Sequence, residues 1–142
     1  YNSNKKIPLF NGSTERELNN FLEYLNKLKY QTSKKLNFVG KIQIIGNKKN
    51  TLYFDAGEPP DYTLSRDYQS GPLSFEYFSE NNKIITNCGY GRKISKQTQL
   101  ISKFTSAQST LCLNDTSVTK LERNKIINRT FGAFIKNSFN VF

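Results

Sequence analysis

The sequence predicts a mainly β, antiparallel domain with one amphipathic helix near its N-terminus. Aromatic residues make up 13% of the chain, with 11 Phe and 8 Tyr, and such side chains fit the pleated, half-buried surface of a sheet. Several short runs alternate apolar and polar residues between turn signals, which is the period of a strand. One stretch near the start repeats its apolar residues at helical spacing instead.

The helix is expected at about residues 15–29. Thr14 followed by Glu17 forms a capping box, in which the hydroxyl accepts an early helical N–H and the carboxylate reaches back to the N-cap. The apolar stripe behind it is expected to pack against a sheet or a neighbouring domain. That stripe consists of Leu18, Phe21, Leu22, Leu25 and Leu28.

Two antiparallel hairpins are expected after the helix. The first spans residues 37–54, and the second pairs residues 73–78 with residues 83–87. Residues 90–102 are basic and lack a period, which predicts a loop. Gln108 is then the polar entry to a further half-buried strand at Leu111–Leu113, which stops at an Asx turn.

Length and composition limit the class of protein. The 142 residues fit one domain, in which roughly two-thirds of the unfolded surface can be buried. No run approaches the length of a membrane span and no charged leader precedes an apolar run, so no membrane partner is expected. Because the first residue is Tyr rather than Met, we expect the chain to be a single-domain piece of a longer protein.

Cysteine and histidine usage excludes several kinds of site. Cys88 and Cys112 form no CxxC motif, so two buried free thiols are expected, and a bridge between them stays open because it depends on the distance between their Cα atoms. The sequence contains no histidine, which excludes a histidine metal site and a histidine general base.

The formal net charge of +10 and the pI of about 9.6 favour a polyanionic partner: nucleic acid, anionic lipid or acidic polysaccharide. A basic stretch with an aromatic residue suits an acidic polysaccharide or single-stranded nucleic acid, and a solvated loop explains it equally well. Nucleic acid is the less favoured partner, because no P-loop, helix-turn-helix spacing or RNA-binding aromatic pair accompanies the stretch. The stretch comprises Tyr90, Arg92, Lys93, Lys96 and Lys103.

Three polar positions between these elements allow two interpretations each. Asp67 beside Arg66 predicts a surface ion pair, or else the edge of a site. Gln69 and Gln108 are either contacts to a sugar or hydrogen-bonded amides at strand ends, and the second interpretation is favoured because most polar groups near a sheet are paired.

Five motifs occur in a fixed order over residues 7–121: LFNGS, LYFDAGEPP, SGPLSFEY, IITNCG and FTSAQSTLCLND. This order resembles the carboxy-terminal β-sandwich domain of heparinase II/III-like polysaccharide lyases, especially an alphaproteobacterial-type branch with a DAG-PPP loop and a VNCG strand. The resemblance implies an antiparallel β-sandwich whose preceding helical toroid domain is absent from this chain. It also implies a periplasmic or extracellular location and elimination chemistry beside a uronic acid carboxylate.

The resemblance further implies that the family's metal-binding and basic set has been replaced. Gln69 and Gln108 stand in two histidine positions of the family motifs, and Asn87 stands in an aspartate position. Amides keep hydrogen-bonding ability but do not transfer protons near neutral pH. The family's zinc site is therefore expected to be lost, with no cofactor and no catalytic residue intact.

The resemblance implies that this domain, together with the toroid domain of the same protein, helps to bind an acidic polysaccharide. It does not imply catalysis by this part alone. Full-length lyase activity through toroid residues stays open. The competing class is a non-enzymatic module that binds acidic glycans or another partner. The candidate polysaccharide contacts are Gln69, Asn87, Gln108, Asp67, Tyr90, Arg92 and Lys93.

Overall fold

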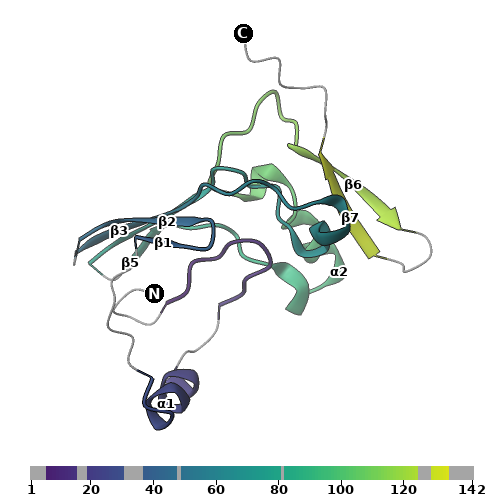
Figure 1. Ribbon diagram of the computed structural model, residues 1–142. Coiled ribbons are helices and arrows are strands. Elements are labelled where there is room, and N and C mark those ends of the chain that lie inside the picture. The colour runs from purple at the N-terminus through teal and green to yellow at the C-terminus, as the bar shows by residue number, and fades with distance from the viewer. Residues whose placement is uncertain are drawn as a thin grey trace.

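The computed structural model describes residues 6–15, 19–30, 37–47, 49–80, 82–124 and 129–134. Its largest element is a five-stranded antiparallel sheet in the order β1-β2-β3-β4-β5 (Figure 1). The strands are β1 (Phe38–Val39), β2 (Ile42–Gly46), β3 (Asn50–Asp55), β4 (Phe75–Ser79) and β5 (Asn82–Ile85). Both predicted hairpins are therefore confirmed, because alternation and turn residues determine strand pairing locally.

One face of the sheet, here called the covered face, packs under the N-terminal segment. Phe10 from that segment joins Tyr53 and Phe78 in the buried apolar cluster, with Ile42 and Ile44 at its margin. The rings of Tyr53 and Phe78 meet edge to face, with centroids 5.4 Å apart. This cluster anchors the N-terminal segment on β2, β3 and β4.

The opposite face, here called the open face, carries an apolar row that crosses four strands in register. Ile45 pairs with Leu52, Leu52 with Tyr77, and Tyr77 with Ile85. The side chains at the two ends of the row, Ile45 and Ile85, are 49% and 38% exposed. A second sheet layer over this face, which a sandwich requires, is not seen in the described part of the chain, so the structure establishes an open sheet with short helices.

The other strands form a separate ladder. β6 (Thr119–Asn124) pairs antiparallel with β7 (Arg129–Phe134) over six residue pairs. Figure 1 shows this hairpin at the end of the molecule away from β5, beside the helical segments. The hydroxyls of Ser70 and Thr119 meet in a buried hydrogen bond, which ties β6 to the segment behind η1 (Tyr62–Asp67).

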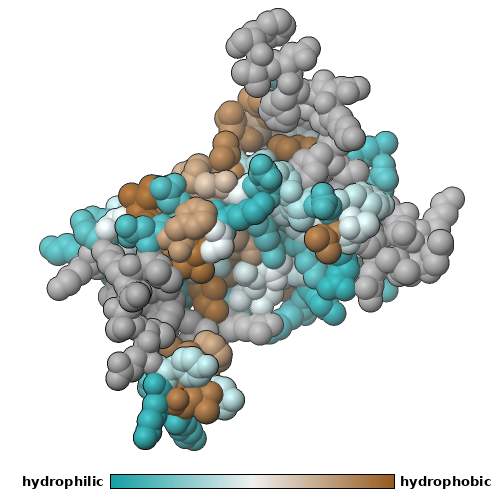
Figure 2. All heavy atoms as spheres, in the orientation of Figure 1, coloured by the Kyte–Doolittle hydropathy of each residue, from teal (hydrophilic) through white to brown (hydrophobic). Residues whose placement is uncertain are grey.

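The N-terminal helix is shorter in the described residues than the sequence predicts. α1 spans Asn19–Lys27, while Glu17 of the predicted capping box lies outside the described residues. Phe21 and Leu28 of the apolar stripe are 55% and 49% exposed, and Figure 2 shows hydrophobic side chains at the surface of α1. α1 lies apart from the sheet in Figure 1, so the expected packing of its stripe against a sheet is not seen. No helix in the described ranges has the length and apolar content needed to cross a membrane.

Two local predictions are wrong. Residues 90–102 are not a plain loop but contain η2 (Gly91–Lys93) and α2 (Lys96–Ile101), which begins where the Ser95 hydroxyl accepts the Thr98 N–H at 3.0 Å. Residues 111–113 are not a strand, and Leu111 is 74% exposed. An N-cap serine outweighs the missing apolar period in the first case, and tertiary placement overrides β-propensity in the second.

Candidate functional site

The three amide positions meet where β4 and β5 separate at one end of the sheet. Gln69 follows η1, Asn87 follows β5, and Gln108 follows η3 (Thr105–Ala107). The segment behind η3 runs beside the start of β4, because the Phe75 N–H donates to the Ser109 carbonyl at 3.3 Å. It also runs beside the end of β5, where the Cys88 N–H donates to the Ala107 carbonyl at 3.3 Å.

Gln69 is the centre of this group and is only 1% exposed. Its Oε1 accepts the Gly12 N–H at 3.0 Å, while its Nε2 donates to the carbonyls of Gly89 at 2.8 Å and Ser102 at 2.9 Å. One buried amide therefore joins the N-terminal turn, the segment after β5 and the end of α2.

Gln108 reaches the same carbonyl from the other side. Its Nε2 donates to the Ser102 carbonyl at 2.8 Å and lies 3.6 Å from the Cys88 sulfur. A Cβ added at Gly71 would stand 2.9 Å from the Gln108 Cγ, so glycine is needed at that position for the close approach. The two glutamines thus converge on one backbone oxygen.

Asn87 joins the group through Ser109, the residue after Gln108. Its Oδ1 accepts both the Ser109 N–H at 2.9 Å and the Ser109 hydroxyl at 3.0 Å. Its own N–H donates to Glu76 Oε1 at 3.0 Å, and Glu76 is fully buried. We call Gln69, Asn87 and Gln108, with their partners Gly89, Ser102 and Ser109, the amide network.

A buried ion pair supports the network from the covered face. Glu76 Oε2 lies 3.8 Å from Lys83 Nζ, which also donates to the Ile7 carbonyl at 3.1 Å and stands 3.3 Å from the exposed Glu15. Sequence analysis missed this pair. Its signal is weak, because Glu76 and Lys83 look like ordinary outward residues of alternating strands, and only the register places them on the covered side.

Asp67 and Tyr90 belong to a second cluster next to the network. The predicted surface pair is confirmed, with Asp67 Oδ2 2.6 Å from an Arg66 guanidinium nitrogen. The Tyr90 hydroxyl donates to Asp67 Oδ1 at 3.0 Å. The Arg66 hydrogen bond lowers the pKa of Asp67 despite some burial, and Tyr90 and Lys103 act in the same direction.

The remaining candidates differ in their exposure. Tyr90 is 7% exposed, so its ring offers little surface for stacking, whereas Arg92 and Lys93 on η2 are exposed. Lys103 is buried, its ammonium donates to the Arg66 carbonyl, and desolvation lowers its pKa. The structure therefore brings five of the seven candidates into two adjoining clusters and leaves a basic pair, Arg92 and Lys93, at the surface.

The cysteines also differ from expectation. Cys88 and Cys112 are free, but Cys88 is exposed rather than buried, and its sulfur donates to the Gly89 carbonyl at 3.1 Å. Partial desolvation raises the pKa of the Cys88 thiol, which keeps it protonated near neutral pH.

The amide network does not fit a zinc ion. Zinc takes imidazole nitrogen, thiolate or carboxylate ligands, and no group of three His, Cys, Asp or Glu side chains lies close enough within the described ranges. The two glutamines direct N–H donors, which cannot ligate a cation, at one carbonyl, and the nearby thiol is protonated. What this arrangement does chemically is to cross-link chain segments that are far apart in the sequence by neutral hydrogen bonds.

Comparison with known families identifies the domain type. The family model for the heparinase II/III-like C-terminal domain matches residues 32–139, about three-quarters of the chain. Comparisons with curated proteins and with solved structures find no match. The chain belongs to the heparinase II/III-like C-terminal domain family.

Proposed function

We propose that this chain is the carboxy-terminal portion of a heparinase II/III-like polysaccharide lyase, that it helps to hold an acidic polysaccharide, and that it performs no elimination chemistry alone. The observation that carries the proposal is the amide network. Gln69 and Gln108 both donate to the Ser102 carbonyl, and because a neutral amide is not a base near neutral pH, neither can take a proton from a sugar.

The binding part of the proposal rests on charge. The chain has a formal net charge of +10, and Arg92 and Lys93 are exposed on η2, directly after the segment that supplies Asn87 and Gly89 to the network. An anionic chain lying along η2 would meet both cations, while the buried clusters below keep the backbone of η2 in place.

The part of the proposal that concerns the rest of the protein, a second sheet layer and a toroid domain, rests on the open face. The row Ile45, Leu52, Tyr77 and Ile85 offers one side of a sandwich core, and a second sheet layer over it would complete the fold expected for this family. The same proposal includes a toroid domain of the same protein, which would form the second wall of the polysaccharide cleft. It also includes a periplasmic or extracellular location and membership of the alphaproteobacterial-type branch.

The test combines an activity assay with a binding assay. With heparin-like and alginate-like substrates, the ultraviolet absorbance of unsaturated uronic products stays flat, and a rise would contradict the non-catalytic part. Arg92→Ala with Lys93→Ala weakens alginate or heparin binding by about tenfold, the sum of two surface charge contacts. The matched control, Lys27→Ala with Lys120→Ala, removes the same charge elsewhere, and equal weakening in both double variants would overturn the assignment to η2.

A second candidate function is a non-enzymatic acidic-glycan module. It is favoured because the polar candidates other than the basic pair all hydrogen-bond within the chain, an arrangement that leaves binding without chemistry. The two functions predict different observations for the full-length natural protein. A helical domain with Tyr and Arg facing this chain supports the lyase, and full-length protein that binds glycan without absorbance change supports the module.

A further inference from the structure

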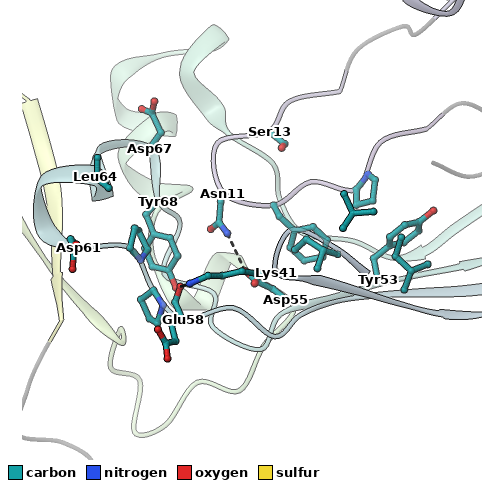
Figure 3. Close-up of a pocket in the computed structure, with 17 residues that line it drawn as sticks. Asn11, Ser13, Lys41, Tyr53, Asp55, Glu58, Asp61, Leu64, Asp67 and Tyr68 are labelled. Atoms are coloured by element: carbon teal, nitrogen blue, oxygen red, sulfur yellow. Dashed lines mark hydrogen bonds between the residues drawn. The ribbon is translucent and has the colours of Figure 1, made fainter. Parts of the chain in front are cut away.

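A cleft of ≈ 880 Å³ opens on the covered face, and none of the residues of the amide network lines it. It lies between the N-terminal segment, the strands β2 and β3, the prolines after β3, and η1 (Figure 3). This volume lies in the range of about 300–1,000 Å³ that is usual for small-ligand sites. Neither the family assignment nor the proposed polysaccharide function assigns a role to this cleft.

The floor of the cleft is apolar and rigid. Ile42 and Ile44 of β2 and the ring of Tyr53 form its base, and Pro59 and Pro60 form one wall. Prolines have few accessible backbone conformations, so a ligand would order little of this wall on binding. The cleft therefore has a preformed surface for the apolar part of a ligand.

Asp55 is the unusual group in this apolar surrounding. It is only 5% exposed, and its carboxylate accepts hydrogen bonds from the Asn11 amide at 3.0 Å and the Gly57 N–H at 3.1 Å (Figure 3). In the described part of the chain Asp55 takes part in none of the ion pairs. The neighbouring Tyr68 has a raised pKa, caused first by burial and then by the Asp55 charge.

A buried carboxylate without a cation is costly, because burial removes the water that solvates its charge. The two neutral donors leave a lone pair on each Asp55 oxygen, and the isoleucines and prolines that line the cleft have no side-chain donor to fill it. A cation in the cleft would supply the missing charge.

The carboxylates at the mouth of the cleft carry the same negative charge as Asp55. Glu58 and Asp61 are exposed carboxylates that line it, while Asp67 lines it but engages Arg66 and Tyr90. Lys41 is the single cation among the lining residues, and its ammonium donates to the Glu58 carbonyl at 3.4 Å. This acidic lining contrasts with the formal net charge of +10 for the whole chain.

We propose that this cleft binds an organic cation, an alkylammonium or guanidinium group on an apolar body, with the charge against Asp55 and the body on the β2–β3 floor. Its lining disfavours an acidic saccharide through like-charge repulsion. A bare metal ion would leave the apolar floor empty, and no three potential ligand side chains converge within the described residues.

The test titrates the 142-residue chain with n-butylammonium, n-butanol and butyrate, each of which has a short unbranched alkyl chain and a head group of different charge. Backbone amide shifts in ¹H–¹⁵N spectra report the site, and we expect saturable changes at Asn11, Ile42 and Gly57 for the ammonium only. Equal binding of n-butanol would show that the cleft binds the alkyl chain alone and would overturn the proposal. Unchanged shifts with all three probes would also overturn it.

Charge variants then locate the cation. Asp55→Asn weakens n-butylammonium binding by at least about tenfold, and Glu58→Gln with Asp61→Asn weakens it by about two- to fivefold. Lys41→Gln tightens it by about two- to fivefold, because it removes the competing charge. The control Glu80→Gln changes an exposed carboxylate outside the cleft and leaves affinity unchanged. If Asp55→Asn does not fold, the rim and Lys41 variants still decide the outcome.

A final comparison identifies the source of the cation. Nα-acetyl-lysine N-methylamide presents the same ammonium as a peptide side chain does, and spermidine presents it on a free polyamine. Tighter binding of either supports the proposal and identifies the source. A heparin oligosaccharide that shifts the same cleft residues would contradict it, and this outcome is independent of whether η2 binds polysaccharide.

Discussion

Gln69 joins three chain segments through one fully buried amide, so its removal leaves several buried polar groups without a hydrogen-bond partner at once. Gln69→Leu keeps the volume but leaves the Gly12 N–H and two carbonyls without that partner. We expect a loss of about 3 kcal/mol or more in the free energy of unfolding, measured by urea denaturation. Gln97→Leu, on the exposed side of α2, is the matched control and should stay within about 0.5 kcal/mol. Equal effects would show that the network does not stabilise the fold.

Asp67 makes stability depend on pH at the acid end. Its folded-state pKa lies below the ordinary value of 3.8, first because of the Arg66 hydrogen bond. A depressed carboxyl pKa contributes stability that is present above the unfolded value and is lost as pH falls through the folded value. Asp67→Asn should therefore cost about 0.5–1 kcal/mol at pH 7, the scale of a partly exposed pair, and progressively less below about pH 4.

The measurement compares urea unfolding of wild type and Asp67→Asn between pH 7 and pH 2.5. Asp115→Asn, at an exposed turn position, is the control and should run parallel to wild type. A difference between wild type and Asp67→Asn that grows on acidification would contradict the assignment.

The two faces of the sheet should respond differently to truncation. Phe78→Ala on the covered face removes a fully buried ring from the apolar cluster and should cost about 3–5 kcal/mol. Ile45→Ala on the open face removes a half-exposed side chain and should cost about 0.5 kcal/mol or less. Urea denaturation of both variants decides. A large cost at Ile45 would show that something in the chain already covers the open face.

The sandwich hypothesis has its own signature at this scale. An uncovered apolar row binds the dye ANS, and Ile45→Lys with Ile85→Lys should reduce the fluorescence gain several-fold without lowering the free energy of unfolding by more than about 1 kcal/mol. Exposed Ile94→Lys on the helical side is the control. Unchanged dye binding in the double variant would place the exposed apolar surface elsewhere.

At the scale of the whole molecule, the net charge of +10 separates specific from general polyanion binding. If η2 is a glycan site, retention on immobilised heparin should depend on Arg92 and Lys93, while retention on DNA should depend on total charge alone. Salt gradients measure both, because each released counterion adds to the slope of affinity against salt. Equal losses on both resins for the η2 variant would favour a nonspecific basic surface.

The sequence by itself determined much of the strand arrangement. Alternating residues and turn pairs located β2–β5, since strand pairing across short turns is a local property. The Arg66–Asp67 pair was equally predictable from adjacency, and the lack of histidine excluded imidazole chemistry outright. The family resemblance followed from motif order and agrees with the match over residues 32–139.

The tertiary structure decided what these residues do. Gln69 and Gln108 meet at the Ser102 carbonyl, and a backbone oxygen has no signature in sequence. Gln108, read as the entry to a strand, instead follows η3, because its amide and the Asn87–Ser109 bonds hold the segment between two strand ends. Asp55 is the last residue of β3, and only the packing of the N-terminal segment and η1 forms a cleft around it. Such convergence depends on contacts between residues far apart in the chain, which local periodicity does not encode.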